Sequence, residues 1–183
     1  SYDTSFEAWK KRKYLFHYRG IQGKEYSTGS GVLHEVIYGL RQLFPDSIME
    51  NAYAPSTEHY AEELMDSKFC LILRGDDPHR SRFNEAVVAG CVPVMINDGW
   101  SLTVAPFSSQ IHYESFTLTI PESMFLAHPT SALRFAYGMS EARLRKMHAA
   151  LLKHRPFVNW GLNETDRSIG KATWETIDDE CNW

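Results

Sequence analysis

The chain lacks any long hydrophobic run. None of its 183 residues belongs to a stretch approaching the roughly 20 apolar residues that cross a bilayer. The first residues, SYDTSFEAWKKRKY, contain neither an apolar signal core nor a transit-peptide bias. The sequence therefore predicts no membrane-spanning or targeting segment within this chain, although that absence does not make the gene product cytosolic.

The chain also has few cysteines and no net positive charge. Three cysteines are too few for a disulfide-stapled miniprotein and do not divide into pairs. We expect Cys70 and Cys91 to be small buried residues on neighbouring strands, and Cys181 to be exposed in the tail. Nineteen basic and 23 acidic residues give a net charge of -4. Because duplex binding needs a broad basic surface, we expect no nucleic-acid partner.

Several cofactor and metal motifs are missing. The glycine-containing stretch Tyr26–Gly31 lacks the full G-x-G-x-x-G spacing and does not directly follow a strand, and there is no Walker lysine motif. None of the eight histidines forms an i, i+4 pair with a third zinc ligand nearby. The acidic pair Asp76-Asp77 precedes Pro78, as in a turn. We therefore predict no metal and no dinucleotide cofactor.

The composition that is present, 43% hydrophobic and 23% charged residues, suits one globular domain spanning residues 1–183. Apolar runs predict five strands, and helical periodicity predicts helices between and after them. The expected strands are Tyr14–Tyr18, Ile48–Asn51, Phe69–Leu73, Val92–Ile96 and Phe116–Ile120; the expected helices are Gly31–Phe44, Thr57–Met65, Ser81–Gly90, Ser131–Tyr137, Ser140–His154 and one within Asn163–Cys181. This alternation predicts an α/β fold: a Rossmann-like parallel sheet with helices on both faces.

Charged residues gather in the loops that would follow three of these strands, after Tyr18, Leu73 and Ile96. Ligands bind at the carboxyl ends of parallel strands. The second loop and the helix after it carry Arg74, Arg80 and Arg82. Guanidinium groups beside the free N–H groups of a helix start form an anion site, suited to phosphate or diphosphate.

Glu85 follows Arg82 at the i+3 position, so the two side chains share one helix face. Two interpretations of this spacing remain open. The carboxylate could accept hydrogen bonds from ribose hydroxyls while the arginine meets phosphates. Alternatively, the two residues form an ordinary surface ion pair.

The segment Phe69–Gly99 resembles the exostosin-type family of glycosyltransferases, and similarity extends over residues 12–120, with a compatible helical part at 121–183. The motifs that carry the resemblance are Phe69-Cys70-Leu71, Gly75-Asp76-x-Pro78, Arg82 with Glu85 and Ala86, Gly90-Cys91-Val92-Pro93-Val94 and Asn97-Asp98, together with Arg12–Leu15, Arg19-Gly20, Pro106-Phe107 and Tyr113–Ile120.

This resemblance implies the donor-binding half of a GT-B fold, in which two Rossmann-like domains face each other. It implies transfer of a sugar, with inversion, from a UDP-type nucleotide sugar to a glycan acceptor in the Golgi or secretory lumen. No metal or other cofactor is implied. The other half, from a missing N-terminal domain or a partner chain, would complete the enzyme; no general base is identifiable in this chain.

Residue by residue, the resemblance makes Arg82 the diphosphate contact and Glu85 the ribose or nucleotide contact. Gly20 would let the first loop approach the donor closely. The other donor-binding candidates are Arg19, Arg74, Gly75, Arg80 and Asp98.

A non-catalytic alternative also remains open: a nucleotide-binding or protein-interaction module derived from this fold. Three departures from the family pattern favour it. Arg80 stands where many relatives have serine, Leu33 occupies the neighbourhood of a frequent arginine, and Trp100–Ala105 lengthens a loop.

Overall fold

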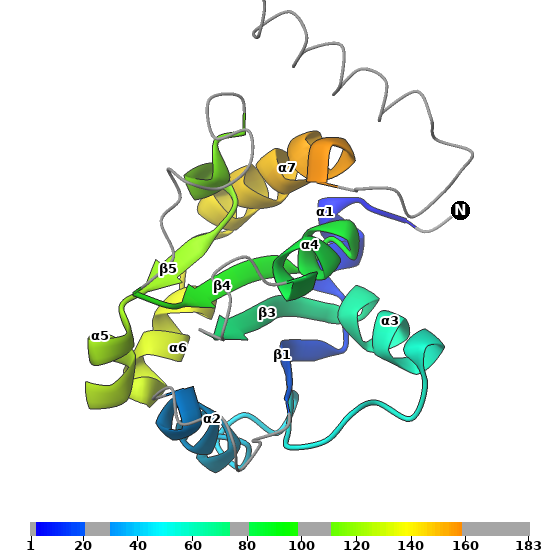
Figure 1. The fold of residues 1–183 in the computed structure, drawn as a ribbon. Helices are drawn as coiled ribbons and strands as arrows, with labels where there is room; N and C mark the ends of the chain where they lie inside the picture. The colour runs from blue at the N-terminus through cyan, green and yellow to red at the C-terminus, as the bar shows by residue number, and fades with distance from the viewer. Residues whose placement is uncertain (1–2, 21–29, 74–80, 99–110, 159–183) are drawn as a thin grey trace, which may run out of the picture.

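A computed structural model describes residues 3–20, 30–73, 81–98 and 111–158 and contains a five-stranded sheet in the order β2-β1-β3-β4-β5 (Figure 1). All strand pairs are parallel. The strands are β1 (Tyr14–Arg19), β2 (Ile48–Glu50), β3 (Ser67–Leu73), β4 (Val92–Ile96) and β5 (Leu118–Ile120). Every predicted strand is thereby confirmed, with bounds that differ by at most two residues.

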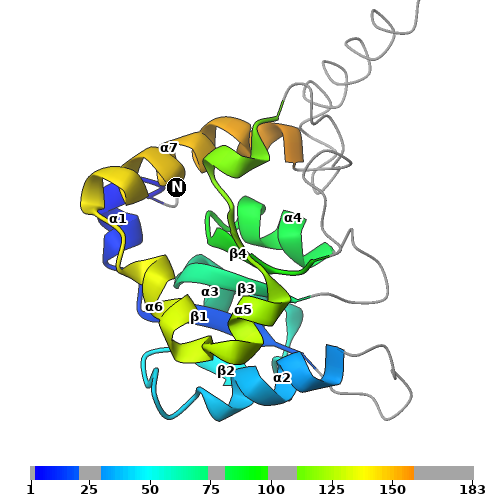
Figure 2. The ribbon, with the colours of Figure 1, turned by 90° about the vertical axis from the view of Figure 1, so that its left-hand side faces the viewer.

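Helices cover both faces of the sheet, as the alternating pattern predicted. They are α1 (Phe6–Lys10), α2 (Ser30–Gly39), α3 (Thr57–Met65), α4 (Ser81–Val88), α5 (Glu122–Ala127), α6 (Pro129–Tyr137) and α7 (Glu141–Val158), with a 3-10 turn at Tyr113–Ser115. One face carries α3 and α4, with α7 packed on α4, whereas α2, α5 and α6 lie on the other (Figures 1 and 2). Within the described ranges, each helix is too short or too polar to span a bilayer.

The strand order reverses between β1 and β3. From β1 the chain passes through α2 to the edge strand β2, and then returns through α3 to the other side of β1. β1 and β3 pair in register, with His17 opposite Cys70. In open parallel sheets, the crevice beyond the carboxyl ends of the strands at such a reversal is the usual ligand site.

Several helix bounds differ from the prediction. α2 ends at Gly39, and hydrogen-bonded turns continue to Phe44. The cap of α3 is Ser56, whose hydroxyl accepts from the N–H of His59. α7 continues beyond the predicted end at His154 to Val158 and contains Pro156, which lacks one helical N–H donor. The predicted helix within Asn163–Cys181 lies outside the described residues.

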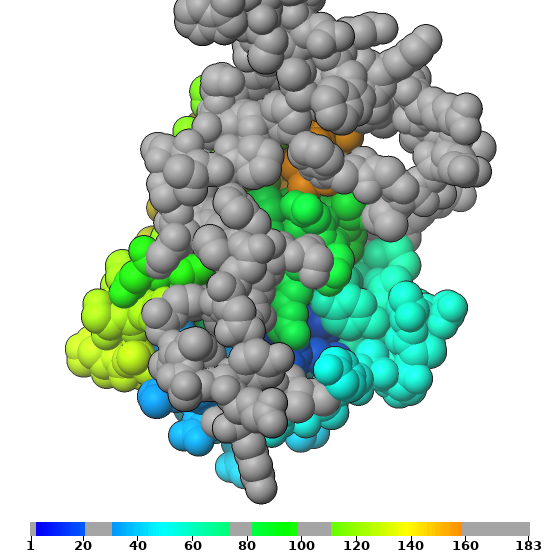
Figure 3. Space-filling view, in the orientation of Figure 1, coloured from blue at the N-terminus to red at the C-terminus, as the bar shows by residue number. Residues whose placement is uncertain are grey.

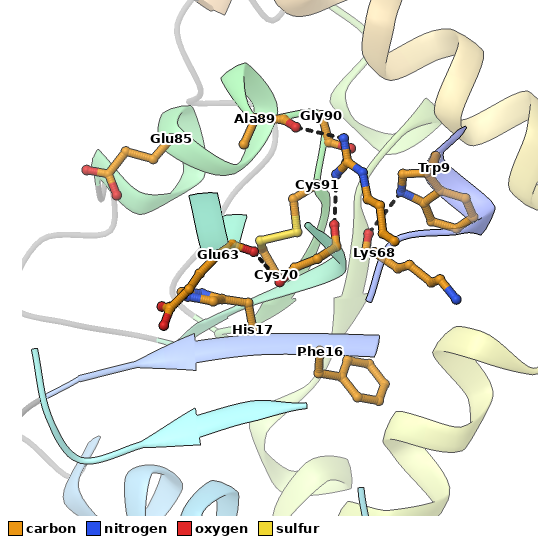
Figure 4. Close-up of a disulfide and its surroundings, with 12 residues drawn as sticks. Trp9, Phe16, His17, Glu63, Lys68, Cys70, Glu85, Ala89, Gly90 and Cys91 are labelled. Carbon is orange, nitrogen blue, oxygen red and sulfur yellow. Dashed lines mark hydrogen bonds and ion pairs between the residues drawn. A yellow bond between two sulfur atoms is a disulfide. The ribbon is translucent and has the colours of Figure 1, made fainter. Parts of the chain in front are cut away.

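Cys70 and Cys91 are buried as expected, but they form a disulfide, which corrects our view of them as separate thiols (Figure 4). Register explains the bond. Cys70 lies opposite Pro93, and Cys91 precedes Pro93 by two residues, so both side chains point to the same face. Their Cα atoms are 5.7 Å apart, a normal separation for a disulfide.

Arg12 fastens the end of α4 to the start of β3. Its buried guanidinium donates to the carbonyls of Ser67 at 2.8 Å, Gly90 at 2.9 Å and Ala89 at 2.9 Å. A cation is favourable there because helix carbonyls point outward at a C-terminus. Gly90 has φ +69°, and an added Cβ would lie 3.0 Å from Nη2 of Arg12. α4 ends at Val88, and the positive φ of Gly90 is typical of a glycine that follows a helix end.

Candidate functional site

A small pocket opens where β1 and β3 end. Its walls are His17–Arg19 of β1, Cys70–Ile72 of β3, Tyr60 and Leu64 of α3, and Arg82 of α4. On this face, α4 (green) lies beside the cyan to turquoise segment that carries α3 (Figure 3). The pocket therefore coincides with the reversal of strand order, where a ligand is expected.

Arg82 stands in the first turn of α4 and is half-buried. Its Nη1 donates a hydrogen bond to the backbone carbonyl of Arg19, and the guanidinium carbon lies 5.7 Å from the ring centroid of Tyr18. The side chain thus bridges from α4 to the carboxyl end of β1, at the edge of the pocket. This bond uses one of the five N–H donors that a guanidinium carries.

Glu85 lies one turn farther along α4 and accepts a hydrogen bond at Oε2 from the hydroxyl of Tyr60, 2.9 Å away. In the described part of the chain, no ion pair joins Glu85 to Arg82. The two side chains instead have separate partners, one on α3 and one on β1. The ion-pair interpretation of their spacing is therefore not what the structure shows.

Arg19, a predicted donor-binding residue, uses its side chain within the protein. Nε and Nη2 each donate to one oxygen of Glu63 at 2.7 Å, and Nη1 donates to Glu50 at 2.8 Å. Burial opposes ionisation of Glu63, but hydrogen bonds from Arg19 and His17 hold its pKa below the usual value. The Arg19 charge is thus balanced by two carboxylates, while its backbone carbonyl anchors Arg82.

His17 completes this buried group beneath the pocket. Its Nε2 lies 3.2 Å from Oε2 of Glu63, and burial lowers the pKa of His17 to about 4 despite that carboxylate. At neutral pH the His17 ring is therefore uncharged. The ion pairs within this group are then those of Arg19 with Glu63 and Glu50.

Gly20 follows β1 directly and is enclosed. The hydroxyl of Tyr38 donates to its carbonyl at 2.8 Å, and a Cβ built on Gly20 would lie 2.6 Å from the hydroxyl of Tyr18. That hydroxyl itself pairs with Nδ1 of His34 at 2.8 Å. A side chain at position 20 would thus collide with Tyr18, which explains the glycine. Close approach of the sugar-nucleotide donor to Gly20 remains a prediction.

Asp98 is exposed after the end of β4 and exchanges two hydrogen bonds with Glu122 at the start of α5. The backbone N–H of Asp98 donates to Oε1 of Glu122 at 3.1 Å, and Oδ1 of Asp98 accepts from the N–H of Glu122 at 2.9 Å. This reciprocal pair caps α5. A donor contact of Asp98 stays a prediction.

The remaining predicted site residues, Arg74, Gly75 and Arg80, lie outside the described residues. Within the described ranges, there is no cluster of three or more histidine, cysteine or acidic side chains suited to a metal ion.

Sequence reasoning missed Tyr60, which α3 brings to the pocket, and Glu63, which binds Arg19. A signal for Glu63 existed: it precedes Leu64 on the side of α3 that is buried, and an acidic residue on a buried helix side needs a partner. The sequence alone does not say that this partner is Arg19.

Comparison with known proteins supplies the family. The Exostosin GT47 domain matches residues 7–134. The chain is 29% identical over 163 residues to a probable glucuronoxylan glucuronosyltransferase of Arabidopsis thaliana, an alignment that covers 88% of this chain and 33% of that protein. It is 40% identical over 72 residues to Exostosin-1b of Danio rerio, covering 39% of this chain and 9% of that protein.

A third relative, the Exostosin-1 homolog of Caenorhabditis elegans, is 41% identical over 70 residues, covering 38% of this chain and 18% of that protein. The chain thus spans about a third or less of the length of the curated relatives that it matches. The family match covers most of the chain and includes every element that borders the pocket. The chain therefore belongs to the exostosin GT47 family of glycosyltransferases.

Proposed function

We propose that this domain binds a UDP-type nucleotide sugar and takes part in transferring the sugar, with inversion, to a glycan acceptor. The observation that carries the proposal is the placement of Arg82 and Glu85. Arg82 stands in the first turn of α4 and lines the pocket at the reversal of strand order, and Glu85 lies one turn farther along α4, bonded to the pocket residue Tyr60. An arginine for the diphosphate and a carboxylate for the ribose thus lie on one helix face.

The chemistry suits a nucleoside diphosphate leaving group. As the bond to the sugar breaks, negative charge grows on the diphosphate. A guanidinium already held by the carbonyl of Arg19 needs little reorganisation to meet that charge. Glu85 is held by Tyr60, and its carboxylate is an acceptor for hydroxyl groups of the ribose. Transfer also needs a general base, which we assign to a second domain or partner chain.

The disulfide supports a secretory location. Cys70 and Cys91 are 3% and 0% exposed, and disulfides persist in oxidising compartments such as the secretory lumen. We therefore propose that the domain works in the Golgi or another part of the secretory pathway. Because the name of one relative specifies glucuronosyl transfer, UDP-glucuronate is the first donor to test.

A non-catalytic nucleotide-binding module is the second candidate, favoured by Leu33. Its side chain is only 1% exposed and belongs to the hydrophobic core, so this position offers no charge to a ligand. A domain that binds nucleotide but supports no transfer would fit that observation.

Calorimetric titration with UDP and UDP-glucuronate tests the proposal. Removing a charged hydrogen-bonding group weakens binding by roughly tenfold to a hundredfold, and we expect that loss for Arg82→Ala and Glu85→Ala. Arg143→Ala, which removes an exposed arginine of α7, is the matched control and should bind as the wild type does. If no nucleotide binds, or if Arg82→Ala binds normally, the donor site is wrongly placed.

Binding alone does not separate the enzyme from the module. The longest natural form of the chain is therefore assayed for sugar transfer and donor hydrolysis with the same nucleotide sugars. Transfer that is lost in Arg82→Ala supports the enzyme, whereas nucleotide binding without transfer or hydrolysis supports the module.

A further inference from the structure

We propose that Tyr60 is a positioning residue, whose hydroxyl holds the Glu85 carboxylate in the orientation that receives the ribose hydroxyls of the donor nucleotide. The proposal rests on the proposed function and adds to it a residue of α3, outside the helix that carries the candidate contacts. Tyr60 would act through Glu85 and not touch the reacting atoms.

The geometry joins two helices across the pocket. The Tyr60 hydroxyl donates to Oε2 of Glu85 over 2.9 Å, and both side chains are half-buried. The bond uses Oε2 as its acceptor, and in this proposal Oε1 receives the ribose hydroxyl. Tyr60 and Arg82 line the same pocket, which places the tyrosine beside both candidate contacts.

The Tyr60 ring is itself fixed. It packs edge-on against the ring of His17, with centroids 5.5 Å apart and planes at 66°. One turn farther along α3, Glu63 binds Arg19 through two hydrogen bonds of 2.7 Å each and lies 3.2 Å from His17. Two successive turns of α3 are thus attached to β1, which limits movement of the tyrosine hydroxyl.

Tyr60 also keeps its proton, because burial and the nearby Glu85 charge raise the pKa of the phenol. The hydroxyl therefore stays a donor at neutral pH, as its hydrogen bond to Oε2 of Glu85 requires.

This bond has a further effect on α4. Glu85 and Arg82 stand at i and i+3 spacing, where carboxylate and guanidinium would readily pair. Instead, Tyr60 holds Glu85 while the carbonyl of Arg19 holds Arg82. A nucleotide then meets two separate charged groups and does not have to break an ion pair first.

The experiment measures discrimination of the ribose hydroxyls. Wild-type protein, Tyr60→Phe and Glu85→Ala are titrated with UDP, 2′-deoxy-UDP and 3′-deoxy-UDP. Loss of a single hydrogen bond changes an equilibrium by roughly threefold to tenfold. Tyr60→Phe should weaken the binding of UDP by that factor. It should hardly change the binding of the deoxy-UDP that lacks the hydroxyl bound by Glu85. The affinity ratio between UDP and that deoxy-UDP should therefore fall. A purely structural defect would weaken all three ligands alike.

The double variant and a control complete the design. In a Glu85→Ala background, Tyr60→Phe should have no further effect on UDP binding, because its target is gone. Tyr137→Phe, which removes a hydroxyl on α6 at the opposite face, should bind as the wild type does. Thermal unfolding of each variant checks that the fold is retained.

Two failures are distinguishable. If wild-type protein binds UDP and Glu85→Ala weakens it, but Tyr60→Phe keeps full ribose discrimination, the role of Tyr60 is overturned and the proposed function stands. If wild-type protein binds none of the three nucleotides, both proposals are overturned together.

Discussion

Breaking the Cys70–Cys91 disulfide should destabilise the domain by a predictable amount. The bond joins residues separated by 21 positions, from β3 to the residue before β4, and encloses the whole of α4. Without it, the unfolded chain regains the freedom of that loop. A loop of this size corresponds to about 11 cal/mol/K of chain entropy, or about 3 kcal/mol at 25 °C.

Two perturbations separate the cross-link from its sulfur atoms. Reduction leaves both sulfurs in place, so it should lower the free energy of unfolding by the loop contribution alone, about 3 kcal/mol. For a domain of this length, that equals a fall in melting temperature of roughly 6–12 °C. The Cys70→Ala/Cys91→Ala variant should lose about 1–2 kcal/mol more, because two fully packed sulfurs are removed from the core.

The assay is urea unfolding followed by circular dichroism, with and without a phosphine reductant, in a Cys181→Ser background that leaves only one possible pair. The double alanine variant should not respond to reductant. A wild-type change smaller than about 1 kcal/mol would refute the loop-entropy reasoning, and two free thiols found by mass analysis of unreduced protein would refute the bond itself.

Two further predictions concern the core and the helix caps. His148 packs against both Phe6 and Trp9, and burial, with the nearby Arg12 charge, lowers its pKa to about 4. Acidification from pH 6.5 to 4 protonates this histidine first in the unfolded chain, so His148 alone should lower the free energy of unfolding by roughly 2–3 kcal/mol. His17, whose pKa is also lowered to about 4, adds to the decline. His148→Phe should therefore remove only its own part of the decline in urea titrations across pH. Gly90→Ala should cost about 1–2 kcal/mol in the same assay, because of the positive φ and the close Arg12. Gly39→Ala, where an added Cβ meets nothing within 4 Å, should be neutral or slightly stabilising, and equal losses at the two positions would contradict the structural reason.

The sheet could be predicted from the sequence because buried parallel strands are continuous apolar runs. Phe69–Leu73 and Val92–Ile96 are such runs and became β3 and β4. Short, partly polar elements gave weaker signals. α1 has only five residues and α5 only six, so each is shorter than two helical turns and too short for the i, i+3, i+4, i+7 pattern that identifies a helix.

The candidate site was only half predictable. Spacing alone placed Arg82 and Glu85 on one face of one helix, which the structure confirms. Their partners come from Arg19 and Tyr60, 63 and 25 residues away in the chain. Periodicity shows which side of α3 is buried but not which strand end or helix that side meets. For a related reason, the disulfide was not predicted. It depends on the register between β3 and β4, which the sequence does not show.

The two ends of α4 make different contacts. Its eight residues measure about 12 Å. Arg82 stands in the first turn and Glu85 in the second, and Arg12 binds the carbonyls of Ala89 and Gly90 just after the last residue of the helix. Figure 4 shows Glu85, Ala89 and Gly90 along this segment. A short helix moves nearly as a rigid body, so a tilt at the Gly90 end displaces Arg82 and Glu85 as well. Arg12, near the amino terminus of the chain, therefore helps to orient Arg82 and Glu85, some 70 positions later in the sequence. Substitutions at Arg12 should alter ligand affinity although Arg12 does not contact the ligand.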